Sequence, residues 1–136
     1  MSRKIFINLP IKDLDRSVEF FSKLGFTFNQ QFTDKNATCM VIGDNIFAML
    51  LVEPFFKTFT KKELADTTKT IEVINAISVD SKKEVDEIIE KALKAGAIEP
   101  RPAQDYGWMF ARSFTDLDNH FWEVFYMDES NAPKNP

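Results

Sequence analysis

The sequence predicts an α+β fold made of two tandem β-α-β-β-β modules. Residues 44–51 align without gaps on residues 118–125, so Met49 corresponds to Glu123, 74 positions later. In each half an apolar alternating segment precedes a helical pattern that ends at a glycine, Gly25 or Gly96. Short apolar runs separated by turn residues then complete each half. An internal repeat of this length indicates two copies of one supersecondary unit.

The first half begins with a strand over residues 4–11, where Ile or Leu occupies every second position. Asp13 is the expected N-cap of a helix that reaches Leu24, with a glycine directly after it. Three antiparallel strands joined by tight turns are expected to follow, over residues 26–32, 38–42 and 46–52.

A long polar connection links the halves and is expected to hold a short helix near residues 61–66. Its Phe55, Phe56 and Phe59 would be costly to expose. Either they cover the core or a dimer interface, or they form part of a lid over a substrate. The lid is an alternative because connections of this length are often functional.

The second half begins with a strand over residues 73–79. Ser81 and Glu84 form a capping box for a helix that ends before Gly96. Short strands are expected over residues 97–99, 106–115 and 120–126, and a frayed polar tail over 131–136. The expected division of the single domain 1–136 is a first module at 4–53, a connecting segment at 54–72, a second module at 73–127 and a tail at 128–136.

Composition excludes several classes of function. The net charge is −4 and the Lys and Arg residues are scattered, which argues against nucleic acid and anionic membranes as partners. The one cysteine, Cys39, excludes an internal disulfide and lies in an apolar run, as a small buried residue would. With neither a signal peptide nor a membrane-spanning stretch apparent, a cytoplasmic location is expected.

Three segments carry a resemblance to a known superfamily. Residues 8–26, including Asn8-Leu9-Pro10 and Leu24-Gly25-Phe26, are very close to the first strand and helix of the vicinal oxygen chelate superfamily. Residues 78–97 match the second copy, and residues 114–124 look like the closing hairpin, with Leu117 and Asn119 in place of the usual proline and glycine. The superfamily includes glyoxalase I, bleomycin and fosfomycin resistance proteins and extradiol dioxygenases. The resemblance implies that the modules form a cupped, partly open mixed sheet.

Metal-dependent members of the superfamily hold a divalent ion with four side chains. The resemblance maps those positions onto Phe6, Met49, Ile74 and Glu123. Three of the four are apolar, and one carboxylate is a poor site for a catalytic divalent ion. His120 is the only histidine, and alternation along the expected strand puts its side chain on the face opposite Glu123. No metal and no other cofactor is expected.

The same resemblance implies an apolar cavity with one carboxylate and one amide, suited to an aromatic or amphipathic ligand. Glu123 is the candidate catalytic acid or base, or else a vestige paired with Arg112, Arg101 or a lysine. Trp108 and Arg112 either reach the cavity mouth or belong to an ordinary half-buried strand. The candidate ligand-binding residues are Phe6, Asn8, Phe47, Met49, Ile74, Trp108, Arg112 and Phe121.

Three functions compete on this basis. A metal-independent small-molecule binding protein of the bleomycin-resistance type is favoured by the apolar residues at the metal-ligand positions. The same apolar residues argue against a metal-dependent lyase or dioxygenase of the glyoxalase I type. A cofactor-free enzyme using Glu123 as acid or base is the third, so the presence of any catalysis stays open. The resemblance also implies a homodimer, because a monomer would expose a large apolar patch.

Overall fold

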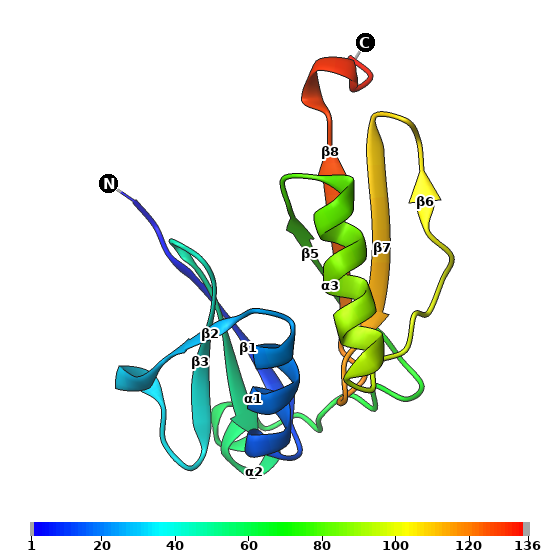
Figure 1. The fold of residues 1–136 in the computed structure, drawn as a ribbon. Coiled ribbons are helices and arrows are strands. Elements are labelled where there is room, and N and C mark those ends of the chain that lie inside the picture. The colour runs from blue at the N-terminus through cyan, green and yellow to red at the C-terminus, as the bar shows by residue number, and fades with distance from the viewer. Residues whose placement is uncertain (1, 135–136) are drawn as a thin grey trace. The chain divides into compact units, whose positions relative to one another are not determined.

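The structure is a computed structural model that describes residues 2–134. The chain forms two compact units, Met1–Asp66 and Thr67–Pro136, and each contains one β-α-β-β-β module (Figure 1). The predicted α+β class is confirmed. No helix among the described residues is long and apolar enough to cross a bilayer.

The first unit has a four-stranded mixed sheet in the order β1-β4-β3-β2, in which only the β1–β4 pair is parallel. The long helix α1 packs against this sheet (Figure 1). The elements are β1 (Ile5–Ile11), α1 (Leu14–Lys23), β2 (Thr27–Asn29), a 3-10 turn (Gln30–Phe32), β3 (Ala37–Gly43), β4 (Ile46–Val52), α2 (Glu53–Phe56) and a second 3-10 turn (Lys57–Phe59).

Helix α1 begins and ends where the sequence predicts. The Asp13 side chain accepts a hydrogen bond from the backbone N–H of Arg16 at 3.1 Å, which satisfies one of the free donors of the first turn. Phe20 and Phe21 are both 2 % exposed and anchor the helix to the sheet. Gly25 follows with φ 102°, a conformation that glycine adopts without steric cost.

Two predictions for the first unit are wrong in detail. The strand expected over 26–32 stops at Asn29, whose side chain accepts from the N–H of Gln31 at 3.0 Å and starts a 3-10 turn. The connection is helical at Glu53–Phe56, immediately after β4, and not at residues 61–66. Pro54 in the first turn favours a helix start there, because its fixed φ is already helical.

The second unit repeats the arrangement, with sheet order β5-β8-β7-β6 and only the β5–β8 pair parallel. The long helix α3 packs against β7 and β8 (Figure 1). The elements are β5 (Ile74–Ser78), α3 (Lys82–Lys94), β6 (Gln104–Asp105), β7 (Met109–Thr115), β8 (Phe121–Met127) and a 3-10 turn (Glu129–Asn131).

The capping box of α3 is present. Ser81 Oγ accepts from the N–H of Glu84 at 3.1 Å, and the Glu84 carboxylate accepts from the N–H of Asp80 at 3.2 Å. The reciprocal bond therefore reaches one residue further back than in the standard motif. Val85 and Ile89 on the inner side of α3 are fully buried, which fixes the helix on its sheet.

The strands between α3 and β8 differ from the prediction. Residues 97–99 make only an isolated bridge, between Ile98 and Thr115, and the edge strand lies at Gln104–Asp105. The strand expected from residue 106 begins at Met109, because a turn at Gly107, with φ 82°, comes first. The frayed tail was expected over residues 131–136. Its first residue, Asn131, belongs to the last 3-10 turn, and residues 135–136 lie outside the described residues.

Each sheet has one face that its long helix covers and one that it does not, here called the helix-free face. In the second unit Phe114 and Trp122 stack on the α3 side, with ring centroids 6.4 Å apart. Alternation along β8 puts Phe121, Glu123 and Phe125 on the helix-free face. By the same alternation, the helix-free face of the first unit carries Phe6, Asn8, Phe47 and Met49.

Candidate functional site

The helix-free face of the first unit carries a stacked aromatic pair. Phe6 of β1 and Phe47 of β4 are register partners, and their rings lie 4.8 Å apart with planes inclined by 13°. Phe6 is 43 % exposed. The Lys4 ammonium lies 5.9 Å from the centre of the Phe47 ring, close enough for a cation–π contact. The pair is an exposed flat apolar surface with a positive charge at its edge.

Asn8 and Met49 form the next register pair along the same two strands. The Asn8 amide donates to the backbone carbonyl of Phe6 at 3.2 Å, so one of its donors is already used within β1. On the other side of Met49 lies Cys39, which is fully buried, as predicted for a small core residue. Burial raises the pKa of the Cys39 thiol, which keeps it protonated and unreactive.

The helix-free face of the second unit has one carboxylate among apolar and small side chains. Ile74 is the register partner of Phe121, and Ala76 is the partner of Glu123. On its other side Glu123 is paired with Ser113 of β7. Glu123 is half-buried and makes no side-chain hydrogen bond or ion pair with any residue in the range 2–134. The alternative in which Glu123 pairs with Arg112, Arg101 or a lysine therefore has no such hydrogen bond or ion pair within this range.

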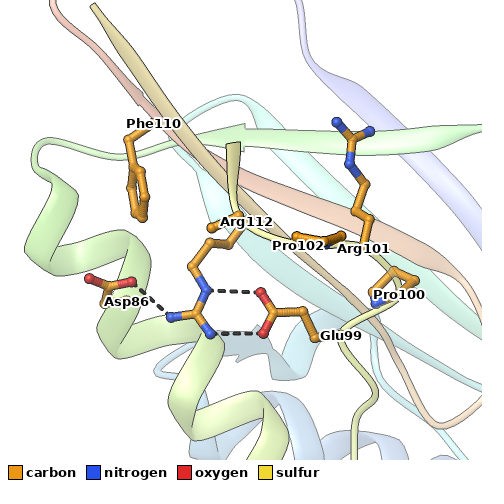
Figure 2. A pocket seen from close by; sticks show the side chains of 8 residues that line it. Asp86, Glu99, Pro100, Arg101, Pro102, Phe110 and Arg112 are labelled. Atoms are coloured by element: carbon orange, nitrogen blue, oxygen red, sulfur yellow. Dashed lines mark hydrogen bonds and ion pairs between the residues drawn. The ribbon is translucent and has the colours of Figure 1, made fainter. Parts of the chain in front are cut away.

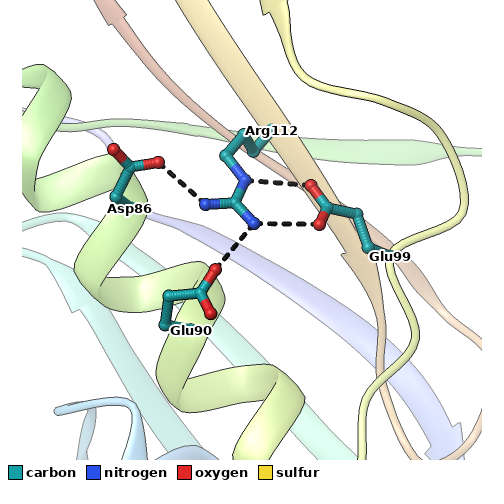
Figure 3. Close-up of polar contacts among 4 residues, drawn as sticks. All are labelled: Asp86, Glu90, Glu99 and Arg112. Atoms are coloured by element: carbon teal, nitrogen blue, oxygen red, sulfur yellow. Dashed lines mark hydrogen bonds and ion pairs between the residues drawn. The ribbon is translucent and has the colours of Figure 1, made fainter.

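Arg112 lies on the opposite face, toward α3 (Figure 3). Its Nε and Nη2 donate to the two carboxylate oxygens of Glu99, each at 2.9 Å. Nη1 donates to Asp86 at 2.8 Å, and Nη2 also donates to Glu90 at 2.8 Å. The Glu99 hydrogen bonds raise the pKa of Arg112 further above its ordinary high value. Arg112 thus ties α3 and the connection before β6 to β7, and does not share a face with Phe121 and Glu123.

A cleft of about 450 Å³ lies beside this ion-pair group (Figure 2). Its walls are Asp86, Phe110, Arg112 and residues 99–103. Figure 2 shows the guanidinium of Arg101 directed away from that of Arg112. The cleft is on the α3 side of the sheet, so it is separate from the surface around Glu123.

Trp108 precedes β7 and stacks with Tyr106, ring centroids 6.3 Å apart. Its carbonyl accepts from the N–H of Asp128 at 2.7 Å, which closes the far end of the β7–β8 pair. Tyr106 is 55 % exposed, so the two rings form an aromatic surface at the β6–β7 turn.

The turn before β8 is organised by a buried carboxylate. Asp116 is 6 % exposed and accepts from Trp122 Nε1 at 2.9 Å and from the N–H groups of Asp118 and His120 at 2.9 and 3.0 Å. Burial raises the pKa of Asp116, although nearby His120 opposes the shift. Asn119 has φ 65°, so it occupies the left-handed position expected from the glycine it replaces.

The four positions at which the resemblance expects metal ligands do not fit a catalytic divalent ion. Phe6 and Ile74 have no donor atom, Met49 offers only a soft thioether, and Glu123 supplies the single hard ligand. Within residues 2–134, no three His, Cys, Asp or Glu side chains are grouped as a metal site would require.

Comparison with known proteins agrees with this architecture. Residues 3–43 match the family described as bleomycin resistance protein-like N-terminal. A hypothetical protein from S. aureus is 26 % identical, with a TM-score of 0.78 over 93 % of this chain and 95 % of that one. A glyoxalase/bleomycin resistance protein/dioxygenase from Nocardioides is also 26 % identical, with a TM-score of 0.72 over 100 % and 91 %. A genomically encoded fosfomycin resistance protein from Listeria monocytogenes is 18 % identical, with a TM-score of 0.68 over 100 % and 96 %. No curated protein matches the sequence.

The fold is thus that of glyoxalase, bleomycin resistance and dioxygenase proteins. Together with the match of residues 3–43 to a bleomycin resistance protein-like family, this fold agrees with the resemblance to the vicinal oxygen chelate superfamily.

One residue of the second helix-free face was not among the sequence candidates. Ser113 is 1 % exposed, and its Oγ has no hydrogen-bond partner in the described part of the chain. A sequence signal for its position existed, because Ser113 and Glu123 are equally distant from Asp118 at the turn. An antiparallel hairpin about that turn brings them opposite each other.

Proposed function

We propose that this protein is a metal-independent binding protein for an aromatic or amphipathic small molecule. The observation that supports this most directly is the Phe6–Phe47 stack, an aromatic pair left 43 % exposed at Phe6 on a sheet face without a helix. Exposed stacked rings bind flat apolar ligands by burial of area and by ring–ring contact. On the first unit, Asn8 and Met49 supply further contact surface beside this stack. On the second unit, Ile74 and Phe121 supply apolar surface beside the Glu123 carboxylate, a polar group that can orient a ligand.

Metal independence is supported by the chemistry of the donor set. Apolar side chains at three of the four expected ligand positions favour an apolar ligand over a hydrated cation. The Nocardioides structure is named a glyoxalase/bleomycin resistance protein/dioxygenase and the Listeria monocytogenes structure a fosfomycin resistance protein, so this fold is shared by proteins named for enzymes and for resistance.

A thermal-shift screen of aromatic compounds tests the proposal, with a chelator present throughout. Binding raises the melting temperature of the wild type, and Phe6→Ala weakens the affinity about tenfold because one ring contact is lost. Phe59→Ala is the matched control, since Phe59 is 68 % exposed in the connection and packs on Phe55. Equal affinities for wild type and Phe6→Ala, or binding that needs an added divalent ion, would contradict the proposal.

A second candidate function is a cofactor-free enzyme in which Glu123 is the acid or base. It is favoured by the absence of any partner for the half-buried Glu123 carboxylate among the described residues. A carboxylate that no protein group occupies is available for proton transfer to a ligand. Turnover of a bound compound that is abolished in Glu123→Gln, while its binding persists, would establish this function.

A further inference from the structure

The buried hydroxyl of Ser113 calls for an explanation. Buried polar atoms in folded proteins nearly always have a hydrogen-bond partner, and an orphaned one costs about 1–3 kcal/mol. Ser113 Oγ is buried without a partner in residues 2–134, on a residue that is 1 % exposed. A site where a hydroxyl and a carboxylate both lack partners is suited to a third group that binds to both.

The sheet register puts that carboxylate beside Ser113. Ser113 and Glu123 are directly opposite each other on β7 and β8, and such partners point to the same face with Cβ atoms about 4.5–5.5 Å apart. This face is the helix-free one, because the alternate residues Phe114 and Trp122 stack toward α3. Ala76, the partner of Glu123 on β5, and Ala111, two residues before Ser113 on β7, are small and leave room around the carboxylate.

The two groups have complementary hydrogen-bonding capacity. A carboxylate only accepts, whereas a serine hydroxyl can both donate and accept. A ligand hydroxyl satisfies both at once, donating its proton to Glu123 and accepting one from Ser113 Oγ. An ammonium group cannot accept, and an ether oxygen cannot donate.

Apolar rings lie along the same strand on either side of Glu123. Phe121 lies two positions before Glu123 on β8 and Phe125 two positions after it, and Ile74 is the partner of Phe121. A ligand hydroxyl held at Glu123 is therefore surrounded by surfaces that favour an aromatic body.

We propose that Ser113 is a specificity-determining residue, which together with Glu123 selects a hydroxyl carried on an aromatic ring. This inference rests on the proposed binding function and names the chemical class of its ligand. Desolvated polar groups reject analogues that leave them unpaired far more strongly than apolar pockets reject a change of size.

The test compares 2-naphthol with 2-methoxynaphthalene, which has the same ring system but no donor. The wild type should bind 2-naphthol at least tenfold more tightly, measured by fluorescence titration with a chelator present. Ser113→Ala and Glu123→Gln should each reduce this preference to less than about threefold by weakening 2-naphthol alone. The double variant should lose little more than either single one, because both groups bind the same hydroxyl.

Ser78→Ala is the matched control, since Ser78 is on the same face, paired with Phe125, and its removal should leave the preference intact. Ser113→Ala should not lower the melting temperature, because the lost hydroxyl has no protein partner and its buried, unpaired state costs stability. Equal binding of both probes by the wild type, or an unchanged preference in Ser113→Ala, overturns the inference and leaves the binding function standing. Failure of both probes to bind overturns the binding function and the inference together.

Discussion

At the scale of single residues, Asp116 is a buried carboxylate that accepts three hydrogen bonds. One oxygen accepts from the two backbone N–H groups of the turn, and the other accepts from the Trp122 indole at 2.9 Å. Trp122 is 1 % exposed and is the largest buried side chain of this core. Asp116 therefore links the geometry of the turn to the position of β8, the strand that carries Glu123.

Removing the Asp116 carboxylate should strongly destabilise the fold. Asp116→Ala leaves two buried donors and one part-buried donor unpaired, and we expect a loss of about 3 kcal/mol in the free energy of unfolding. Asp116→Asn keeps one acceptor oxygen and should lose less. Urea denaturation monitored by Trp fluorescence measures both, and a loss below about 1 kcal/mol for the alanine variant would disagree with the hydrogen bonding.

The pH dependence of stability should also change at this residue. A carboxyl whose pKa is raised in the folded state binds its proton more tightly there than in the unfolded chain. The free energy of unfolding then falls as the pH rises from the unfolded value near 3.9 through the folded pKa, and the contribution is constant above that. Asp116→Asn should remove this part of the decline. If the wild type and this variant lose stability in parallel across that window, Asp116 does not contribute to it.

At the scale of elements, Arg112 connects three segments of the second unit. Its guanidinium is bound by Asp86 and Glu90 of α3 and by Glu99 of the following connection, and its side chain is only 13 % exposed. Bidentate geometry at Glu99 makes this pairing stronger than an ordinary surface ion pair. The three carboxylates would repel one another without the cation.

Arg112→Ala should therefore cost about 3 kcal/mol of unfolding free energy, in the range found when one member of a buried ion pair is removed. Arg112→Lys keeps the charge but not the fork of donors, so an intermediate loss is expected. Lys83→Ala is the control, because Lys83 makes only an exposed ion pair with Glu87 at 3.8 Å. Chemical denaturation that gave equal losses for Arg112→Ala and Lys83→Ala would contradict this role.

The elements that the sequence predicted well are those with strong local signals. Both long helices carry capping residues, Asp13 and Ser81, that act through bonds to backbone N–H groups three residues on. The edge strand at Gln104–Asp105 was missed because two residues have no periodicity to recognise. Arg112 is paired with Val124 and so lies on the face opposite Glu123, where its ion pairs with α3 could not be read from the strand pattern.

The candidate site was predictable only in part, for the same reason. The alternation of side chains along the strands predicts that Phe6 lies on the same face as Asn8, and that Phe121 lies on the same face as Glu123. Ser113 was absent from the prediction because a serine in a strand is not marked as a binding residue, although the spacing about Asp118 places it opposite Glu123. Its importance is visible only once burial and the missing hydrogen-bond partner are known.

At the scale of the whole molecule, the two units are variations on one plan. Each has a parallel pair formed by its first and last strands, β1 with β4 and β5 with β8. Met49 and Glu123 occupy equivalent positions in these repeats, so the polar group exists in one copy only. The duplicated plan supplies two surfaces with different chemistry, one aromatic and the other containing the carboxylate.

Large apolar side chains remain exposed at or just before the start of the first strand of each unit. Ile5 and Phe6 are 54 % and 43 % exposed, and Val73 and Ile74 are 51 % and 48 % exposed. We expect these surfaces to be buried in a homodimer, since exposed apolar patches of this kind mark interaction sites. Light scattering at micromolar concentration should give about twice the chain mass of 15.7 kDa. A mass equal to that of one chain would contradict the expectation.

The most direct test of the central claim is elemental analysis of the purified protein combined with ligand titration. The account predicts much less than one Ni, Zn, Mn or Fe per chain, and the same affinity for 2-naphthol with a chelator as with each added ion, because Phe6, Met49 and Ile74 supply no hard ligand. About one bound ion per chain that is lost in Glu123→Gln, together with binding that depends on that ion, would contradict it.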